Sequence, residues 1–395
     1  MELNHQAIDF TNSEIAFKNK TNAQLKEAYV LFKIMNNPFW VKTGKNLTRF
    51  AFSIHLPIDW IIRNTIYKFF VGGRSIEDCS KTIKKLSERN VHTILDFAAE
   101  GEEDDKIFDN TCNEVLRTID YAKENSNTPF SVFKITGIAR FDLLVKVSAK
   151  EELTQEEKQE YERVYNRVKS IFHKGYELGV PVLVDAEETW IQPILDDLFL
   201  EFMKAYNKEK AIVHNTYQMY CHNSINSLKE HHKIALENGV KFGLKIVRGA
   251  YMEKERARAK EMGYPSPIQP DKAATDRDFN AIIHYLVDNI DTIDFMVATH
   301  NEESSELLAR LIKGKNLPLN HPSIYFAQLY GMSDHITYNI AEKGYNVAKY
   351  VPYGAVKTMM PYLFRRAEEN SSVKGQSSRE LRLIESEVKR RKQNS

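Results

Sequence analysis

From residue 92 onward, short apolar runs alternate with longer stretches in which apolar residues recur at helical spacing. The short runs are rich in β-branched and aromatic residues, which is typical of buried strands. They lie at 92–100, 130–138, 180–188, 211–218, 242–250, 294–301, 323–331 and 346–354. The stretches between them predict helices at 109–125, 155–178, 191–207, 224–238, 275–289, 304–313 and 333–343. Eight strands that alternate with helices predict an α/β fold, the (βα)8 TIM barrel of parallel strands.

The residues before the barrel predict an α-helical region, with a strong helix pattern at 22–35. The most apolar stretch, residues 50–70, is interrupted by Pro57 and by three charged residues. A membrane-spanning helix needs about 20 predominantly apolar residues, so this stretch predicts a buried helical hairpin instead. The expected organisation is an α-helical N-terminal region at 1–88, a barrel at 89–370 and a polar, basic, solvated tail at 371–395.

Composition and charge exclude several classes of function. The net charge of +1 gives no general attraction to nucleic acid, so no nucleic-acid partner is expected. Cys79, Cys112 and Cys221 are too widely spaced for a metal-ligand motif and odd in number for a disulfide framework, so no metal site is expected. The N-terminal residues lack the pattern of a secretory or transit peptide. A cytoplasmic protein is therefore predicted, with peripheral binding at the inner face of the cytoplasmic membrane left open.

Polar side chains occur at the carboxyl end of nearly every predicted strand, which is where the active sites of TIM barrels form. An open, doubly wound sheet would gather such residues at a crevice in a similar way, but the number of strands favours the barrel. No GxGxxG motif is present, so a Rossmann-type dinucleotide site is not expected. The residues that the barrel would gather at one end include Lys134, Asp185, Glu187, Asn215, Gln218, Arg248, Thr299, His300, Asn301, Gln328 and Tyr350.

The stretch 349–370 predicts a strand end, a tight turn and a C-terminal helix over the barrel mouth. Pro361 either kinks this helix or lies in its first turn. An arginine pair on a helix is often only a solvated charged face, but arginine also suits bidentate capture of a carboxylate. The spacing places four side chains on one face of the helix, and this favours a site for a small anionic substrate. They are Tyr362, Arg365, Arg366 and Glu369.

Several segments, in this order along the chain, resemble the sequence motifs of the proline dehydrogenase family. They are VFKITGI at 132–138, LVDAEE at 183–188, NTYQMY at 215–220, LKIVRGAYMEKER at 244–256, ATHN at 298–301, QLYGM at 328–332 and KYVPYGAVKTMMPYLFRRAEEN at 349–370. The resemblance implies a TIM-barrel flavoenzyme that uses FAD to oxidise L-proline to 1-pyrroline-5-carboxylate. In that reaction a hydride passes from ring C5 to flavin N5 and the electrons then pass to a quinone, as the first step of proline catabolism to glutamate.

The resemblance also implies roles for individual residues. Lys134, Arg365 and Arg366 would hold the proline carboxylate, with Asp185 as a counter-charge. The walls around the proline ring would be Tyr251, Leu329, Tyr350 and Tyr362. Contacts to FAD would come from Asn215, Lys245, Val247, Arg248, Gly249, Ala250, Thr299, His300, Asn301, Gln328 and Glu369. Family members differ at two of these places, because some carry arginine in place of Lys245 and some carry glutamine in place of Asn215.

Three alternatives stay open from the sequence. A hydroxyproline dehydrogenase would share the flavin site, although Tyr350 is expected to crowd the position of a 4-hydroxyl group. A non-redox barrel enzyme, such as a lyase of the aldolase type, would use Lys134 or Lys245 as a Schiff-base nucleophile. A non-catalytic binding protein would dock to a membrane or a nucleic acid through the basic C-terminal residues.

Overall fold

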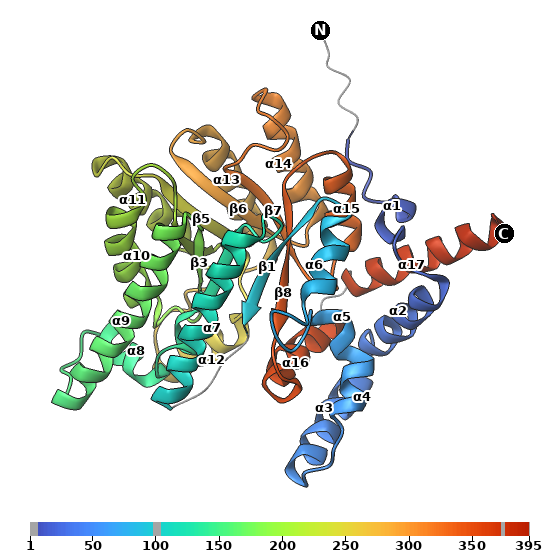
Figure 1. Cartoon of the computed structure of the whole chain (residues 1–395), viewed down its shortest axis with the longest axis horizontal. Coiled ribbons are helices and arrows are strands. Elements are labelled where there is room, and N and C mark those ends of the chain that lie inside the picture. The colour runs from blue at the N-terminus through green and yellow to red at the C-terminus, as the bar shows by residue number, and fades with distance from the viewer. Residues whose placement is uncertain (1–6, 98–103, 373–375, 395) are drawn as a thin grey trace.

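Eight parallel strands pair in sequence order and the last pairs with the first, so the sheet closes into a barrel (Figure 1). The computed structural model describes residues 7–97, 104–372 and 376–394. The strands are β1 (Val91–Phe97), β2 (Phe130–Lys134), β3 (Val182–Asp185), β4 (Val213–Gln218), β5 (Phe242–Val247), β6 (Ile293–Ala298), β7 (Ile324–Leu329) and β8 (Val347–Tyr353). Each predicted run contains one strand, which confirms the (βα)8 barrel. The end of the first run, 98–100, lies outside the described residues.

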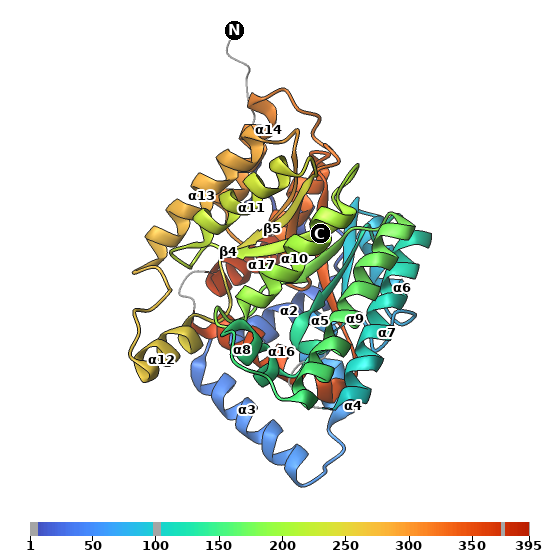
Figure 2. The same ribbon diagram turned by 90° about the vertical axis from the view of Figure 1, so that its left-hand side faces the viewer.

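Helices that connect the strands surround the barrel (Figure 2). They are α7 (Asp105–Glu124), the short turn η2 (Ile135–Gly137), α8 (Phe141–Ser148), α9 (Gln155–Leu178), α10 (Gln192–Tyr206), α11 (Ser224–Glu237), α12 (Met252–Met262), α13 (Lys272–Asp288), α14 (Glu302–Gly314) and α15 (Asp334–Glu342). Helices α8 and α12 were not predicted from the sequence. Helix α12 buries only Glu255 and Ala259, so it lacks the apolar periodicity that marks the longer helices.

Helix α9 shows how local sequence sets the bounds of a predicted helix. Thr154 and Glu157 form a capping box at its start, so backbone donors that lack helical partners are satisfied there. Gly179 follows the last residue with a φ of 68°, a left-handed conformation that glycine adopts without strain. Val164, Val168 and Ile171 form a buried stripe that packs on the barrel.

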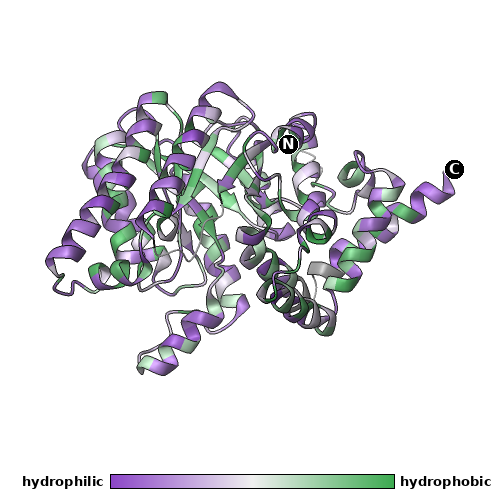
Figure 3. Ribbon diagram, turned by 60° about the horizontal axis from the view of Figure 1, so that its bottom comes forward, coloured by the Kyte–Doolittle hydropathy of each residue, from purple (hydrophilic) through white to green (hydrophobic). Residues whose placement is uncertain are grey.

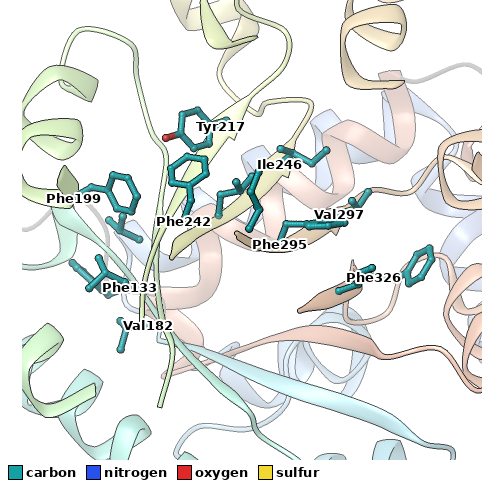
Figure 4. Close-up of a cluster of buried hydrophobic side chains, with 14 of the residues drawn as sticks. Phe133, Val182, Phe199, Tyr217, Phe242, Ile246, Phe295, Val297 and Phe326 are labelled. Atoms are coloured by element: carbon teal, nitrogen blue, oxygen red, sulfur yellow. The ribbon is translucent and has the colours of Figure 1, made fainter. Parts of the chain in front are cut away.

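Alternation of side chains along each strand separates the barrel interior from the layer beneath the helices. Inward residues such as Ile94, Val132 and Leu183 form a compact interior cluster. Outward residues form the larger core, and Figure 4 shows Phe133, Val182, Phe242 and others of this set. Figure 3 shows the hydrophobic strands inside a shell of mixed and hydrophilic helices. The same alternation decides which polar residues face the barrel mouth.

Both ends of the chain build a second apolar core beside the barrel. In this core α2 packs with the C-terminal helices, and Phe32, Met359 and Ile384 are buried. The N-terminal elements are α1 (Ser13–Phe17), α2 (Asn22–Met35), α3 (Pro38–Ser53), α4 (Asp59–Ile62), η1 (Arg63–Tyr67), α5 (Lys68–Phe70) and α6 (Ser80–Ser87), and the C-terminal ones are α16 (Val356–Ser372) and α17 (Gln376–Gln393). The predicted helical N-terminal region is therefore observed, whereas the domain divisions at 88 and 370 stay a prediction.

The stretch 50–70 is helical except at 54–58, and the prediction that it is buried is wrong for its first part, whereas Ile62, Tyr67 and Phe70 near its end are buried. Helices α3 and α4 project from the body of the molecule (Figures 1 and 2), and Phe50 and Trp60 are 61% and 73% exposed. Apolar composition identifies these helices but does not show which face turns toward the protein. Within 7–97, 104–372 and 376–394, no helix is long and apolar enough to cross a membrane.

The polar C-terminal residues also differ from the prediction of a solvated tail, because 376–393 form helix α17. Leu383 and Ile384 are buried against the N-terminal helices. Arg391 donates hydrogen bonds to the backbone carbonyl groups of Phe17 and Lys20, at 3.0 and 2.7 Å. A few apolar residues on one face, together with charged residues that bond to the backbone, are enough to dock this helix.

Candidate active site

A network of four charged side chains lies at the carboxyl end of the barrel interior. Lys134 on β2 donates a hydrogen bond to Asp185 on β3 at 2.9 Å and lies 3.5 Å from Asp96 on β1. Lys245 on β5 donates to the other carboxylate oxygen of Asp185. Lys245 also donates to the hydroxyl of Tyr350 on β8 at 2.7 Å. Side chains from five strands thus meet at one end of the barrel.

The ionisation of Asp185 follows from its neighbours. Burial by itself raises the pKa of this carboxyl group, but the charges of Lys134 and Lys245 outweigh burial and lower the pKa to about 2. Burial lowers the pKa of Lys245, against the effect of Asp185 beside it. Asp185 is therefore a fixed negative charge at neutral pH that orients two cations in the mouth.

Helix α16 lies beyond the end of the barrel toward which β1 points (Figure 1). It runs through Pro361 and presents Tyr362, Arg365 and Arg366 on one face. Tyr362 and Arg366 are buried, and the Arg366 guanidinium lies over the Tyr362 ring at 5.2 Å. Arg366 is paired with Glu369 at 2.5 Å. The predicted helix face is thus turned toward the protein rather than toward solvent.

Contacts connect this helix to the barrel mouth. Leu329, at the end of β7, packs against both the interior cluster and the core that contains α16. Burial raises the pKa of Tyr362 to about 12, and Asp96 and Arg366 are among the charges that act on this hydroxyl group. The Tyr362 hydroxyl is buried and has no hydrogen-bond partner within the described residues. The mouth therefore holds a buried polar group whose hydrogen bond a bound molecule could supply.

A second group of predicted residues lies beside the mouth, after β5 and β6. Arg248 donates to the hydroxyl groups of Thr299 at 2.6 Å and Ser304 at 3.0 Å, and it pairs with Asp276 at 2.7 Å. Its guanidinium lies 4.3 Å from the centre of the Phe279 ring. These contacts fix the direction of Arg248 at the end of β5.

The loop after β5 contains Gly249 and Ala250, both exposed, between the partly buried Val247 and Tyr251. Gly249 has a φ of 133°, and a Cβ at this position would lie 2.6 Å from atoms of the Tyr220 ring. Glycine is therefore required here, because the backbone passes directly over an aromatic ring.

The residues after β6, and Gln328 on β7, make different hydrogen bonds. His300 shares a hydrogen bond with the hydroxyl group of Ser333 at 2.9 Å, and burial lowers its pKa to about 3, so the imidazole is neutral. Asn301 caps helix α14, because its side-chain oxygen accepts the Ser304 N–H at 2.8 Å. Gln328 donates to the Thr299 carbonyl oxygen at 3.1 Å and accepts from Thr337 on α15. Its amide thus joins the loop after β6 to helix α15, on the outer side of β7.

The structure places Asn215 differently from the prediction. Its amide donates to Asp196 on α10 at 2.8 Å, so the side chain points out of the barrel. Inward positions on β4 belong to Thr216 and Gln218, and the buried Gln218 donates to the Glu187 carbonyl oxygen at 2.7 Å. Gln218 was expected among the polar residues at the strand ends, but no contact with substrate or cofactor was predicted for it. Counting alternate positions along β4 would have identified it, because side chains two apart share a face.

Asp96 was also missed as a candidate, although it ends the inward series of β1. It lies within reach of Lys134 at 3.5 Å. The signal is again the alternation, since Asp96 follows the inward Ile94 by two residues. Among the described residues, no cluster of three or more histidine, cysteine, aspartate or glutamate side chains is arranged to hold a metal ion.

Glu187 provides a prediction about stability near the site. Burial raises its pKa to about 7, although its carboxylate accepts hydrogen bonds from the backbone and hydroxyl groups of Thr136. Relative to an ordinary value of 4.5, the folded state binds the extra proton, so stability falls as pH rises from about 4.5 to about 7. Glu187→Gln keeps an oxygen that accepts the Thr136 N–H, and its amide nitrogen can donate to the Thr136 hydroxyl oxygen, without a charge. It is expected to stabilise the protein by up to about 3 kcal/mol above pH 7 and little near pH 4.5.

Thermal unfolding of wild type and Glu187→Gln at acidic and alkaline pH measures this effect. The gap between the two Tm values is expected to widen as pH rises. Thr136→Val, which removes one hydrogen bond to the carboxylate, serves as a control for a loss of contact alone. A gap that is the same at both pH values would show that Glu187 does not titrate as described.

Comparison with known proteins identifies the family. A family model described as proline dehydrogenase matches residues 79–379. "Proline dehydrogenase 1, mitochondrial" of Dictyostelium discoideum is 30% identical over 434 residues, which cover 98% of this chain and 76% of that protein. "Hydroxyproline dehydrogenase" of Xenopus laevis is 28% identical and covers 98% of this chain and 90% of that protein.

The fold also matches a solved structure. Proline utilization A from Bdellovibrio bacteriovorus superposes with a TM-score of 0.71 and 22% identity over 92% of this chain. This chain spans 38% of the length of that protein, and at 22% identity the match shows the fold alone. The family model covers the whole barrel and the helix over its mouth. The chain therefore belongs to the proline dehydrogenase family of oxidoreductases.

Proposed function

We propose that this protein oxidises L-proline to 1-pyrroline-5-carboxylate with FAD as its cofactor. The observation that carries the proposal is the meeting of the Lys134–Asp185–Lys245 network with the buried face of α16. The side chains of Lys134, Lys245 and Arg366 and the buried phenol group of Tyr362 thus lie around one end of the barrel. A small zwitterion with a carboxylate and an apolar ring suits such a site. Family membership supports the same substrate.

The polar groups at the ends of β4 and β5 are of the kinds that can bind FAD. Lys245 and Arg248 supply two cations from one strand and its end, and Gln218 adds a buried amide on the neighbouring strand. Gly249 lets the backbone pass without a side chain, and the neutral His300 lies at the next loop. Cations near the flavin ring favour its reduced, anionic form, which is how a protein tunes this cofactor. When bound, FAD would supply the acceptor for two electrons.

The chain's own residues would bind, orient and enclose the substrate. Lys134, Arg365 and Arg366 would hold the carboxylate of proline, and Asp185 would keep Lys134 in place. The ring would lie between Tyr251, Leu329, Tyr350 and Tyr362. Because the nearby charges are mostly cations, they lower the pKa of the bound amine and favour its neutral form. That form has the lone pair that the oxidation of C5 requires, so no separate strong base is needed.

Proline-dependent reduction of a dye acceptor, with chemical detection of 1-pyrroline-5-carboxylate, tests the proposed reaction. Replacing the dye by a lipid-soluble quinone tests the proposed electron acceptor. We expect product with both acceptors. Formation of a cleavage product without reduction of any acceptor would instead support the lyase alternative.

Hydroxyproline is a second candidate substrate, favoured by the relative named hydroxyproline dehydrogenase. Tyr350 faces the barrel interior, is buried and is held by Lys245, so it forms a rigid wall. An apolar wall rejects an added hydroxyl group by only about a hundredfold. We therefore expect L-proline to be preferred over trans-4-hydroxy-L-proline, with weak but measurable turnover of the latter.

Tyr350→Ser is expected to narrow or reverse this preference, mainly through a loss of efficiency with proline. Tyr350→Phe keeps the wall while removing the hydroxyl group, so it should retain the preference. Ratios of kcat/KM for the two substrates measure both effects. An unchanged ratio in Tyr350→Ser would remove Tyr350 from the specificity wall.

A further inference from the structure

Helices α3 and α4, with the turn between them, form a projecting element at 38–62 that we call the N-terminal hairpin (Figures 1 and 2). Its large apolar side chains are unusually exposed, and they outnumber those exposed on the rest of the described chain. Single exposed apolar residues are common on proteins, but a contiguous group marks a binding surface. The group includes Phe39, Trp40, Leu47, Phe50, Ile54 and Trp60.

Helix α3 turns its apolar stripe away from the protein. Trp40, Leu47, Phe50 and Ile54 recur at helical spacing and are between 50% and 63% exposed. Of the whole helix, only Ala51 is buried. An amphipathic helix on a globular protein normally buries this stripe, so the arrangement is inverted.

The inner side of α3 contacts the protein through a few apolar side chains, Val41, Ala51 and Phe52, and through two basic ones. Lys45 pairs with Glu368 on α16. Lys45 and Arg49 also lie over the Phe364 ring, at 5.6 and 5.7 Å. The helix is therefore held by a mixed apolar and basic inner side, and the larger apolar stripe is left facing outward.

The charge of the hairpin indicates which kind of surface fits it. Residues 38–62 contain three basic residues, Lys42, Lys45 and Arg49, and a single acidic residue, Asp59 at the start of α4. Tryptophan and phenylalanine beside basic residues are the composition of helices that lie in the headgroup region of anionic membranes. Helix α3 has only 16 residues, and no helix in the described part of the chain can span a bilayer. The fitting geometry is thus a helix that lies in the membrane surface.

We propose that the N-terminal hairpin docks the protein on an anionic phospholipid surface, with the outward stripe of α3 inserted among the lipid headgroups. Because α3 packs on α16, docking would place the helix of the proposed proline site next to the lipid. If the proposed function holds, a lipid-soluble acceptor could then reach the mouth from the membrane. The docking itself depends only on the hairpin.

Flotation of the full-length protein with vesicles tests the proposal. The vesicles are made of phosphatidylcholine alone or of phosphatidylcholine with phosphatidylglycerol. We expect the wild type to bind the anionic vesicles at least about tenfold more strongly than the neutral ones. The double variant Leu47→Glu/Phe50→Glu should reduce binding to anionic vesicles by about tenfold or more, because it places two carboxylates in the stripe.

The control variant Leu236→Glu/Tyr176→Glu adds the same charge at exposed positions of α11 and α9. It should bind anionic vesicles like the wild type, and thermal unfolding should show that both variants are folded. Reduction of a water-soluble dye by proline, measured on the same samples, tests the proposed reaction separately from docking.

Three results would overturn the proposal. The first is that the wild type stays with neither vesicle type or binds both equally. The second is that the control variant loses as much binding as Leu47→Glu/Phe50→Glu. The third is that the wild type is a dimer that this double variant converts to a monomer without any vesicle binding, since the stripe would then be a contact between two copies of the chain.

Discussion

Replacing Arg366 by methionine is expected to weaken the binding of proline by roughly tenfold to a few hundredfold, which corresponds to one charge-assisted contact of about 1.5–3 kcal/mol. Arg366 is buried on the inner face of α16, over the ring of Tyr362, whose hydroxyl group has no hydrogen-bond partner among the described residues. Arg365→Met is expected to weaken binding in the same range, since both guanidinium groups would hold the carboxylate. Equilibrium titration of each variant with L-proline measures the change.

Arg140→Met is a matched control for this experiment. Arg140, just before α8, makes a two-pronged contact with the carboxylate of Glu160 on α9, at 2.8 and 3.1 Å, and no role in substrate binding is proposed for it. It should lose little stability and no affinity for proline. If both α16 variants bound proline as tightly as Arg140→Met, the assignment of the carboxylate site to α16 would be wrong.

Asp185→Asn is expected to have the second large effect, because it leaves Lys134 and Lys245 without their shared counter-charge. Removing one partner from a buried ion pair costs about 3–5 kcal/mol. The folded pKa of about 2 lies below the ordinary value of 3.8, so the carboxylate stabilises the protein above that value. This contribution is lost as pH falls through about 2. Denaturant unfolding at neutral pH should therefore show a large loss, together with weaker binding of proline.

The chain contains a close analogue for comparison. Asp334 also lies between two lysines, Lys20 and Lys349, at 3.1 Å from each, and their charges outweigh burial to lower its pKa to about 2. Asp334→Asn should cost similar stability but change proline affinity much less. If both variants lost affinity equally, Asp185 would contribute to the site only through the stability of the fold.

The strands and most connecting helices were predictable because their signals are local. Each buried run carries β-branched residues, and the capping box at Thr154 sets the start of α9 at the predicted residue. Helix α12 was missed because its sequence is nearly all polar and exposed. Local patterns also could not show which way a helix faces. The hairpin around Phe50 was therefore predicted to be buried, and the C-terminal helix around Ile384 was predicted to be solvated.

The site was predictable where a residue lies at an inward position of a strand end. Lys134, Asp185 and Tyr350 meet in the barrel mouth, as expected from a series of polar strand ends. Asn215 was chosen from the same kind of signal without counting the alternation, and its side chain faces α10. The contact between Lys245 and Tyr350 joins residues 105 apart in the sequence, so only the closed barrel reveals it.

The most direct test of the proposed reaction is to add L-proline to the purified protein without oxygen and to follow the flavin absorbance at roughly 450 nm. We expect a yellow protein whose absorbance bleaches on addition of L-proline and returns when a quinone is added. In Arg366→Met the bleaching should require a much higher concentration of proline. A flavin-bound protein whose spectrum does not change with L-proline, while a different amine bleaches it, would contradict the proposed reaction.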